Sequence, residues 1–129
     1  MRKIRNTLII VISLFLLVSC STTPKYKCSE LHRQYGLKAI EIADNYLDFN
    51  ITASEAYEKL NELCERENEL PKTESNDETH FANTLIEVDV SNITGQMMHV
   101  KYEVNEDKLQ KIIDTRNRLA DDVGVEKRG

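Results

Sequence analysis

The six residues NITASE, at positions 50–55, decide how the chain folds. Thr52 and Glu55 have the spacing of a capping box, in which the N-cap hydroxyl and the carboxylate three residues later each accept a backbone N–H. Hydrophobic residues recur at steps of three and four on both sides of this stretch, as they do along amphipathic helices. We therefore predict two antiparallel helices that are joined by a tight turn at residues 50–52.

The segment before the turn, residues 29–49, has the pattern of a single helix. Ser29 is suited to the N-cap position, and Glu30 places negative charge in the first turn. Gly36 is the weak point of this helix, because glycine costs about 1 kcal/mol relative to alanine. Asn50 is expected to end the helix in a left-handed conformation. The hydrophobic stripe is formed by Leu31, Tyr35, Ala39, Ile42, Tyr46 and Phe49, and is widened by Ile40, Ala43 and Leu47.

Two more segments fit helices on the same grounds. The one after the turn has a hydrophobic face made by Ala53, Ala56, Tyr57, Leu60, Leu63 and Cys64. Residues 69–78 are polar and read as a loop. The last helix has Asn105 as its cap and Gly124 as its stop. Arg116 lies on the hydrophobic face of this helix, and we expect its stem to follow that face with the charge exposed.

The segment 79–104 fits two structures. Phe81 and Val88 are spaced for a helix, whereas alternating hydrophobic residues on either side of Gly95 suit a β-hairpin within 85–104. A lone hairpin needs a partner sheet, and no other segment of the sequence reads as a strand. We therefore predict a helix, with a break near Gly95 as a variant. The expected fold is all-α, a small antiparallel bundle of three to four helices after an N-terminal signal helix, and the alternative is an α+β fold with the hairpin.

The N-terminus has the layout of a secretory signal. Arg2, Lys3 and Arg5 precede an apolar run at 8–18 that only Ser13 interrupts. As a helix, these eleven residues would span about 17 Å, against about 30 Å for the hydrocarbon core of a bilayer. The run therefore indicates a leader that is removed, not a permanent membrane span.

The residues Leu17-Val18-Ser19-Cys20 resemble the lipobox of bacterial prolipoproteins. This resemblance implies a signal peptide at 1–19, cleavage before Cys20, and acyl chains such as palmitate on that cysteine. A small residue at Ser19 gives the peptidase access, and a thiol can form a stable thioether. Two acyl chains anchor a protein stably, where one would be marginal.

The resemblance at the N-terminus and the helices predicted from the residue pattern together give an organisation for the chain. The lipidated cysteine and a short tether would occupy 20–28, a helical domain 29–124 and a tail 125–129. The chain would sit on the extracytoplasmic face of the cell membrane, or on the outer membrane of a host with two membranes, because Ser21 and not Asp follows the cysteine. The mature part also loosely resembles small uncharacterised helical lipoproteins of Gram-positive bacteria.

The composition argues against nucleic-acid binding and against the common catalytic motifs. Removing three basic residues from the formal charge of −5 leaves −8 for residues 20–129, without the basic clusters that phosphate contacts need. No two of His32, His80 and His99 are four residues apart, so no zinc-binding helix face exists. A nucleophile elbow and a phosphate-binding glycine loop are absent as well. We therefore expect no catalytic residue, metal site or cofactor, and a non-enzymatic protein.

Two cysteines remain besides Cys20. In an oxidising compartment, Cys28 and Cys64 are candidates for a disulfide. In the predicted helical hairpin, however, they lie at levels that differ by about 15 Å, whereas a disulfide needs Cα atoms within about 7 Å. The alternative, two free thiols, stays open.

Three functions are compatible with these features. The leading hypothesis is a membrane-anchored, non-enzymatic binding protein whose partner is another envelope protein or a wall component. A carrier of a small lipid or peptide is the alternative, and it requires an apolar cavity above about 300 Å³. A hydrolase or metal-dependent enzyme is the remote alternative, and it requires His80 or His99 to meet acidic residues in a cleft.

Overall fold

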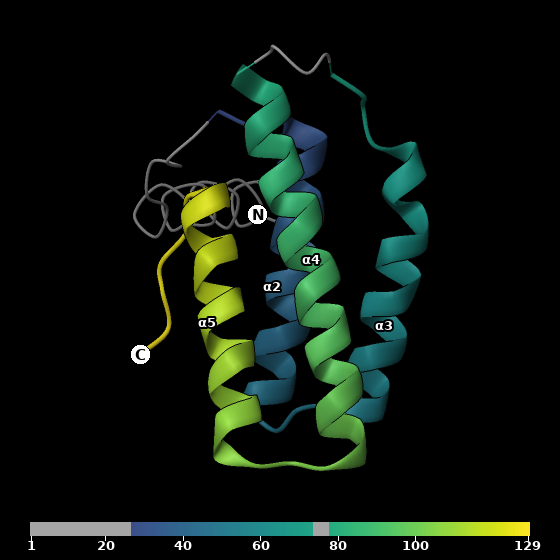
Figure 1. Ribbon diagram of the computed structural model, residues 1–129, viewed down its shortest axis with the longest axis vertical. Coiled ribbons are helices and arrows are strands. Elements are labelled where there is room, and N and C mark those ends of the chain that lie inside the picture. Colours follow the sequence, from purple (N-terminus) through teal and green to yellow (C-terminus); the bar gives the residue numbers. More distant parts are fainter. Residues whose placement is uncertain (1–26, 74–77) are drawn as a thin grey trace, which may run out of the picture.

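Helices α2 (Glu30–Leu47) and α3 (Ala53–Glu65) form the predicted hairpin (Figure 1). The computed structural model describes residues 27–73 and 78–129. The capping box at the start of α3 is present, because Glu55 donates its backbone N–H to the Thr52 hydroxyl at 3.1 Å and accepts the Thr52 N–H at 3.3 Å. The helix start predicted from the NITASE stretch is therefore confirmed.

The end of α2 differs from the prediction. Phe49, and not Asn50, adopts the left-handed conformation, with φ of 63°. The Phe49 N–H donates to the Tyr46 carbonyl at 3.1 Å, and the Asn50 N–H donates to the Asn45 carbonyl at 2.8 Å. These two bonds make a Schellman motif, which requires its left-handed residue directly after the C-cap, here Asp48. The left-handed conformation therefore falls one residue earlier than asparagine would favour.

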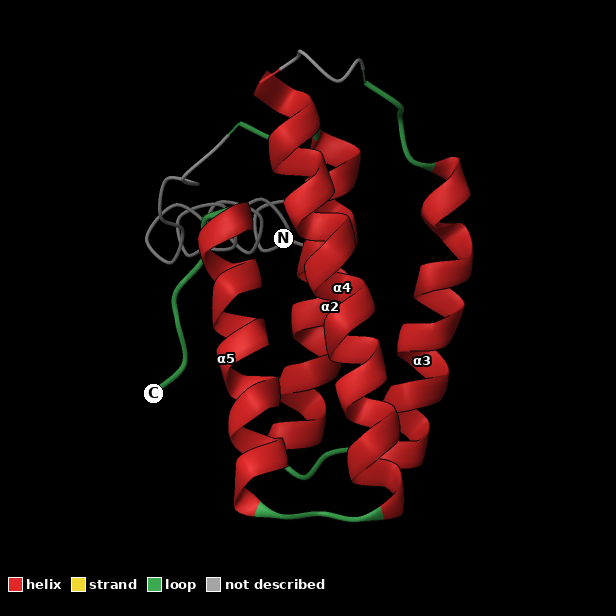
Figure 2. Cartoon of the chain, viewed as in Figure 1, coloured by secondary structure: helices red, strands yellow, loops and turns green. Residues whose placement is uncertain are grey.

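Helix α4 (Glu78–Tyr102) follows a short 3₁₀-helix, η1 (Arg66–Glu69), and runs without interruption through Gly95. Residues 27–73 and 78–129 contain no β-strand (Figure 2), so both the hairpin alternative at 85–104 and the break near Gly95 are wrong. Burial explains why, since Ile86 and Val90 have no exposed surface while Val88, which a strand would place on the same face, is 49% exposed. Packing of a helical stripe overrides the strand preference of these residues.

Helix α5 (Glu106–Val123) completes the all-α bundle. Asn105 caps it by accepting the Lys108 N–H at 2.9 Å, and Gly124 ends it with φ of 77°, both as predicted. Helices α2 and α4 each pack against all the other α-helices of the described part of the chain. The core between the helices contains Leu60, Ile86, Val90, Ile93, Met97, Val100, Ile112, Leu119 and Val123.

The guanidinium of Arg116 is buried, so the prediction of an exposed charge was wrong. It donates to both carboxylate oxygens of Asp44, at 2.8 and 3.0 Å, and to the Glu126 carbonyl at 2.7 Å. The side chain is covered because residues 125–129 turn back along α5, where Arg128 exchanges backbone hydrogen bonds with the Asn117 amide at 2.8 Å. The tail is thus part of the packed domain.

Gly36 is required by packing. A Cβ at this position would lie 2.8 Å from Cγ1 of Val123 and 3.2 Å from Cγ2 of Ile86, so the glycine lets α2 approach both α4 and α5. The cost in helix propensity is therefore compensated by a close contact between helices.

Every helix within 27–73 and 78–129 is too short or too polar to cross a bilayer. The lipobox residues Leu17, Val18, Ser19 and Cys20, the signal peptide and most of the tether lie outside the described residues.

Candidate functional site

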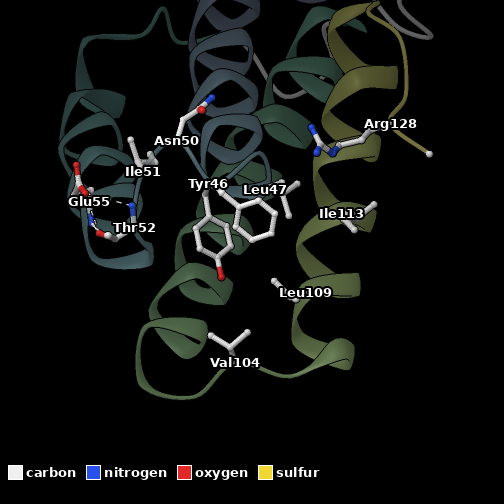
Figure 3. A pocket seen from close by; sticks show the side chains of 12 residues that line it. Tyr46, Leu47, Asn50, Ile51, Thr52, Glu55, Val104, Leu109, Ile113 and Arg128 are labelled. Atoms are coloured by element: carbon white, nitrogen blue, oxygen red, sulfur yellow. Dashed lines mark hydrogen bonds between the residues drawn. The ribbon is translucent and has the colours of Figure 1, made fainter.

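An apolar groove of about 700 Å³ lies at the end of the bundle where the α2–α3 and α4–α5 links meet, at the lower end in Figure 1. Figure 3 shows the side chains of Tyr46, Leu47, Leu109 and Ile113 around this hollow, with Val104 at its lower edge. The remaining lining residues are Phe49, Asn50, Ile51, Thr52, Glu55, Arg128 and Gly129.

The helix ends explain why apolar side chains are left uncovered here. Tyr46 and Leu47 belong to the last turn of α2, and Leu109 and Ile113 belong to the first turns of α5. Each pair continues the hydrophobic stripe of its own helix, but the bundle core ends before these side chains are fully enclosed. The groove is therefore an open continuation of the core.

Phe49 lines the groove in an unusual state for an aromatic residue. Its side chain is 95% exposed, and its backbone has φ of 63°, a conformation that costs a non-glycine residue about 1–2 kcal/mol. Glycine is the usual residue at this position of a Schellman motif. The exposed ring thus makes no compensating contact within the domain, and strain of this kind is typical of functional sites.

More apolar surface lies beside the groove. Tyr102, the last residue of α4, is 80% exposed, and Val104 in the following link is also exposed. Together with Phe49 they put three large apolar side chains at one end of the bundle. Clusters of this kind mark interaction surfaces more often than single exposed residues do.

The cation that lines the groove is already paired. Arg128 binds the Asp48 carboxylate at 2.5 Å and lies 3.5 Å from that of Asp44. The hydrogen bond with Arg128 lowers the pKa of Asp48, and the same bond raises the pKa of Arg128. The guanidinium therefore has its charge compensated within the domain.

The opposite end of the bundle holds a buried polar network that sequence analysis missed. The Ser29 hydroxyl contacts Nδ1 of His32 at 2.7 Å, and Nε2 of His32 contacts the Glu87 carboxylate at 2.9 Å. The order of groups resembles that of a hydrolase triad, but His32 is 0% exposed and the Ser29 hydroxyl also accepts the His32 N–H as a helix cap. With no exposed surface on the histidine, the network is suited to capping α2. Glu87 follows His32 by 55 positions, so no local pattern could have paired them.

The other two histidines lie in different surroundings. His80 lines a polar hollow of about 410 Å³ that Glu67 and Glu87 also line, with Nδ1 3.1 Å from the Thr73 hydroxyl. His99 is exposed on α4. Among the residues that the structure describes, no three His, Cys, Asp or Glu side chains are placed to hold a metal ion.

A carboxyl pair joins α4 to α5 near the predicted tether. Burial, together with a hydrogen bond and the charge of Asp89, raises the pKa of Asp122 to about 7. Asp89 is itself buried and lies 3.5 Å from Arg118. A proton shared between two such carboxyl groups removes the repulsion that two charges would cause.

Cys28 and Cys64 are free thiols in the structure, so the candidate disulfide is not formed. The Sγ atom of Cys64 lies 3.3 Å from the Thr94 hydroxyl on α4, and Cys64 also contacts Tyr35 on α2. Cys28 precedes Tyr35 by seven residues, about 10 Å of helix rise, which keeps the two thiols apart.

Comparison with known proteins adds no relationship. No family model matches the chain, and no curated protein or solved structure is significantly similar to it.

Proposed function

We propose that this chain is a lipid-anchored extracytoplasmic protein that binds a partner in the cell envelope through the apolar groove. The position in the envelope is supported by the basic leader, the apolar run and the lipobox that ends at Cys20. The proposal assigns the chain no catalysis, cofactor or metal.

The observation that carries the binding role is the state of Phe49. A side chain that is 95% exposed contributes little to folding, and its left-handed backbone opposes folding. Large aromatic residues are frequent energetic centres of protein interfaces. A partner that covers this ring would remove its apolar surface from water, worth about 25 cal/mol per Å².

The position of the groove relative to the tether supports the same role. The tether joins the domain just before α2, and the 18 residues of this helix rise about 27 Å to the groove. The seven residues between Cys20 and Cys28 span at most about 25 Å when they are fully extended. The anchored domain would therefore stay close to the bilayer, with the groove at the end of the domain away from its point of attachment, where proteins of the envelope can reach it.

A carrier of a small lipid or peptide is the second candidate. A volume of about 700 Å³ is above the limit of about 300 Å³ that this function requires. However, carriers enclose most of the surface of their ligand, whereas Phe49 and Tyr102 at this end are almost fully exposed. This exposure favours a macromolecular partner.

Site-specific photocrosslinking in the producing bacterium tests the proposal. Replacing Phe49 with p-benzoylphenylalanine keeps an aromatic ring at the groove, and the same replacement at Glu58, exposed on α3, is the matched control. We expect a defined adduct with one envelope protein from position 49 only, and its loss when Ile113→Asp is added. Adducts from both positions, or none from position 49, would contradict the proposal.

A further inference from the structure

We propose that the partner segment seated in the groove is amphipathic and basic, with apolar side chains against the groove and lysine or arginine residues toward its rim. This inference rests on the proposed binding function and names the chemistry of the partner. It follows from the way the charges around the groove are already paired.

The cation that lines the groove, Arg128, and the nearby Lys108 are engaged within the domain. Arg128 binds Asp48 and Asp44, as described above. Lys108 donates to the Glu103 carbonyl at 3.1 Å and lies 3.6 Å from its carboxylate. An anionic partner would have to break one of these pairs to gain Arg128 or Lys108 as its counter-ion.

Of two further lysines near this end, Lys101 and Lys111, the first is also engaged. Lys101 on α4 lies 5.4 Å from the centre of the Tyr57 ring on α3, within the range of a cation–π contact. Lys111, exposed on the second turn of α5, forms no ion pair among the described residues, so the cation that lines the groove and two of its three neighbours are held by groups of the domain itself.

Two carboxylates that lie between groove residues in the chain, which we call the acidic rim, are in the opposite situation. Glu106 and Asp107 lie between the groove residues Val104 and Leu109, are exposed, and form no ion pair within residues 27–73 and 78–129. Both stand in the first turn of α5, where the positive end of the helix dipole makes acidic side chains favourable. They leave negative charge beside an apolar surface, which complements a segment that is both apolar and basic.

The same charges argue against other occupants. A second copy of the chain would bring this acidic rim against its own equivalent, in molecules whose residues 20–129 carry a formal charge of −8. A fatty acid would place its carboxylate where Arg128 is already bound. A basic segment meets neither obstacle.

Peptide binding to the full lipidated chain in phosphatidylcholine nanodiscs tests the inference, with empty nanodiscs as the blank. The probe is a fluorescent 14-residue peptide of leucine and lysine at helical spacing, and the comparison peptides replace every lysine with glutamate or with glutamine. We expect fluorescence anisotropy to show binding of the lysine peptide at least tenfold tighter than of either comparison peptide.

Variants separate the groove from general charge attraction. We expect the double variant Glu106→Gln and Asp107→Gln to weaken binding of the lysine peptide about 5- to 20-fold, as loss of two close charge contacts would. The control pair Glu58→Gln and Glu62→Gln removes the same charge from α3, and binding should change less than twofold. Ile113→Asp should remove binding although it adds a negative charge, and circular dichroism checks that each variant is folded.

The outcomes distinguish the inference from the function on which it rests. Equal binding of all three peptides, lost in Ile113→Asp, would overturn the basic partner and leave the groove as a binding site. Equal weakening by the α3 control pair would overturn the inference as well, because attraction would then come from net charge alone. Failure of the photocrosslink at position 49 would overturn the binding function itself, whatever the peptides do.

Discussion

Replacing Phe49 with glycine should make the domain more stable while removing its ability to bind. The left-handed backbone of Phe49, with φ of 63°, costs about 1–2 kcal/mol relative to glycine. Glycine also destabilises the folded state by roughly 0.5–1 kcal/mol, because it loses more backbone entropy on folding, and this offsets part of the gain. Because the side chain is 95% exposed, little buried apolar surface is lost. We therefore expect a net gain of about 0.5–1 kcal/mol in the free energy of unfolding.

Thermal and urea unfolding measure this gain, which corresponds to a rise of about 2–6 °C in Tm for a domain of this size. Phe49→Ala is the matched control, since alanine lacks the ring but keeps the Cβ atom that makes the left-handed conformation costly. Its stability should not rise. In the peptide assay both variants should bind at least tenfold more weakly than the parent chain. A glycine variant that is less stable than the parent would refute the strain argument, and one that binds normally would refute the role of the ring.

Further predictions concern the packed core and its buried charges. Gly36→Ala should destabilise the domain by about 1–3 kcal/mol in urea unfolding, despite the better helix propensity of alanine, because the new Cβ would lie 2.8 Å from Val123; an unchanged midpoint would contradict the packing argument. Asp44→Ala should lower the free energy of unfolding by about 2 kcal/mol, since it leaves the buried Arg116 guanidinium without its carboxylate. A decrease below about 0.5 kcal/mol, on the order of a surface ion pair, would contradict this prediction. Burial raises the pKa of Asp122 from 3.8 to about 7, so between these pH values the folded chain keeps a proton that the unfolded chain releases. The contribution of Asp122 to the free energy of unfolding is therefore fully present below pH 4 and is lost as the pH rises through about 7. The variant Asp122→Asn should not show this loss, and at pH 8 it should be more stable than the parent by about 2 kcal/mol. The full pKa shift corresponds to about 4 kcal/mol, and half of it is expected because the side chain is only partly buried. Equal slopes of stability against pH in both proteins would contradict this prediction.

The helix boundaries could be predicted where a local rule applies. Ser29, Thr52 and Asn105 were identified as caps because the groups that a cap satisfies lie within three residues of it. Gly124 was identified as a stop by the same short-range logic. Phe49 escaped this reasoning, because the Schellman motif set the position of the left-handed residue by hydrogen bonds and not by residue preference.

Features that depend on distant contacts could not be predicted in the same way. The charge of Arg116 is buried because Asp44, 72 positions earlier, faces it across the bundle. The segment 79–104 is rich in β-branched residues, which favour strands. It forms helix α4 because one face of that helix is buried among the other helices.

The groove was hidden from sequence analysis for a related reason. Leu109 and Ile113 have the spacing of core residues, and the spacing does not reveal where the facing helix ends. Phe49 likewise continued the stripe of α2 in the sequence, although its ring lies outside the core in the structure. Because the predicted helix 29–49 included Phe49, no signal in the sequence indicated that its ring is exposed.

The anchor on Cys20 is the claim on which the position of the groove depends, and mass spectrometry of the native N-terminal peptide tests it most directly. We expect the chain to begin at Cys20, with a diacylglycerol thioether on its sulfur, and Cys20→Ser to keep its leader uncleaved. A chain that begins at another residue, with Cys20 unmodified, would contradict the anchor and with it the proposed orientation of the bundle.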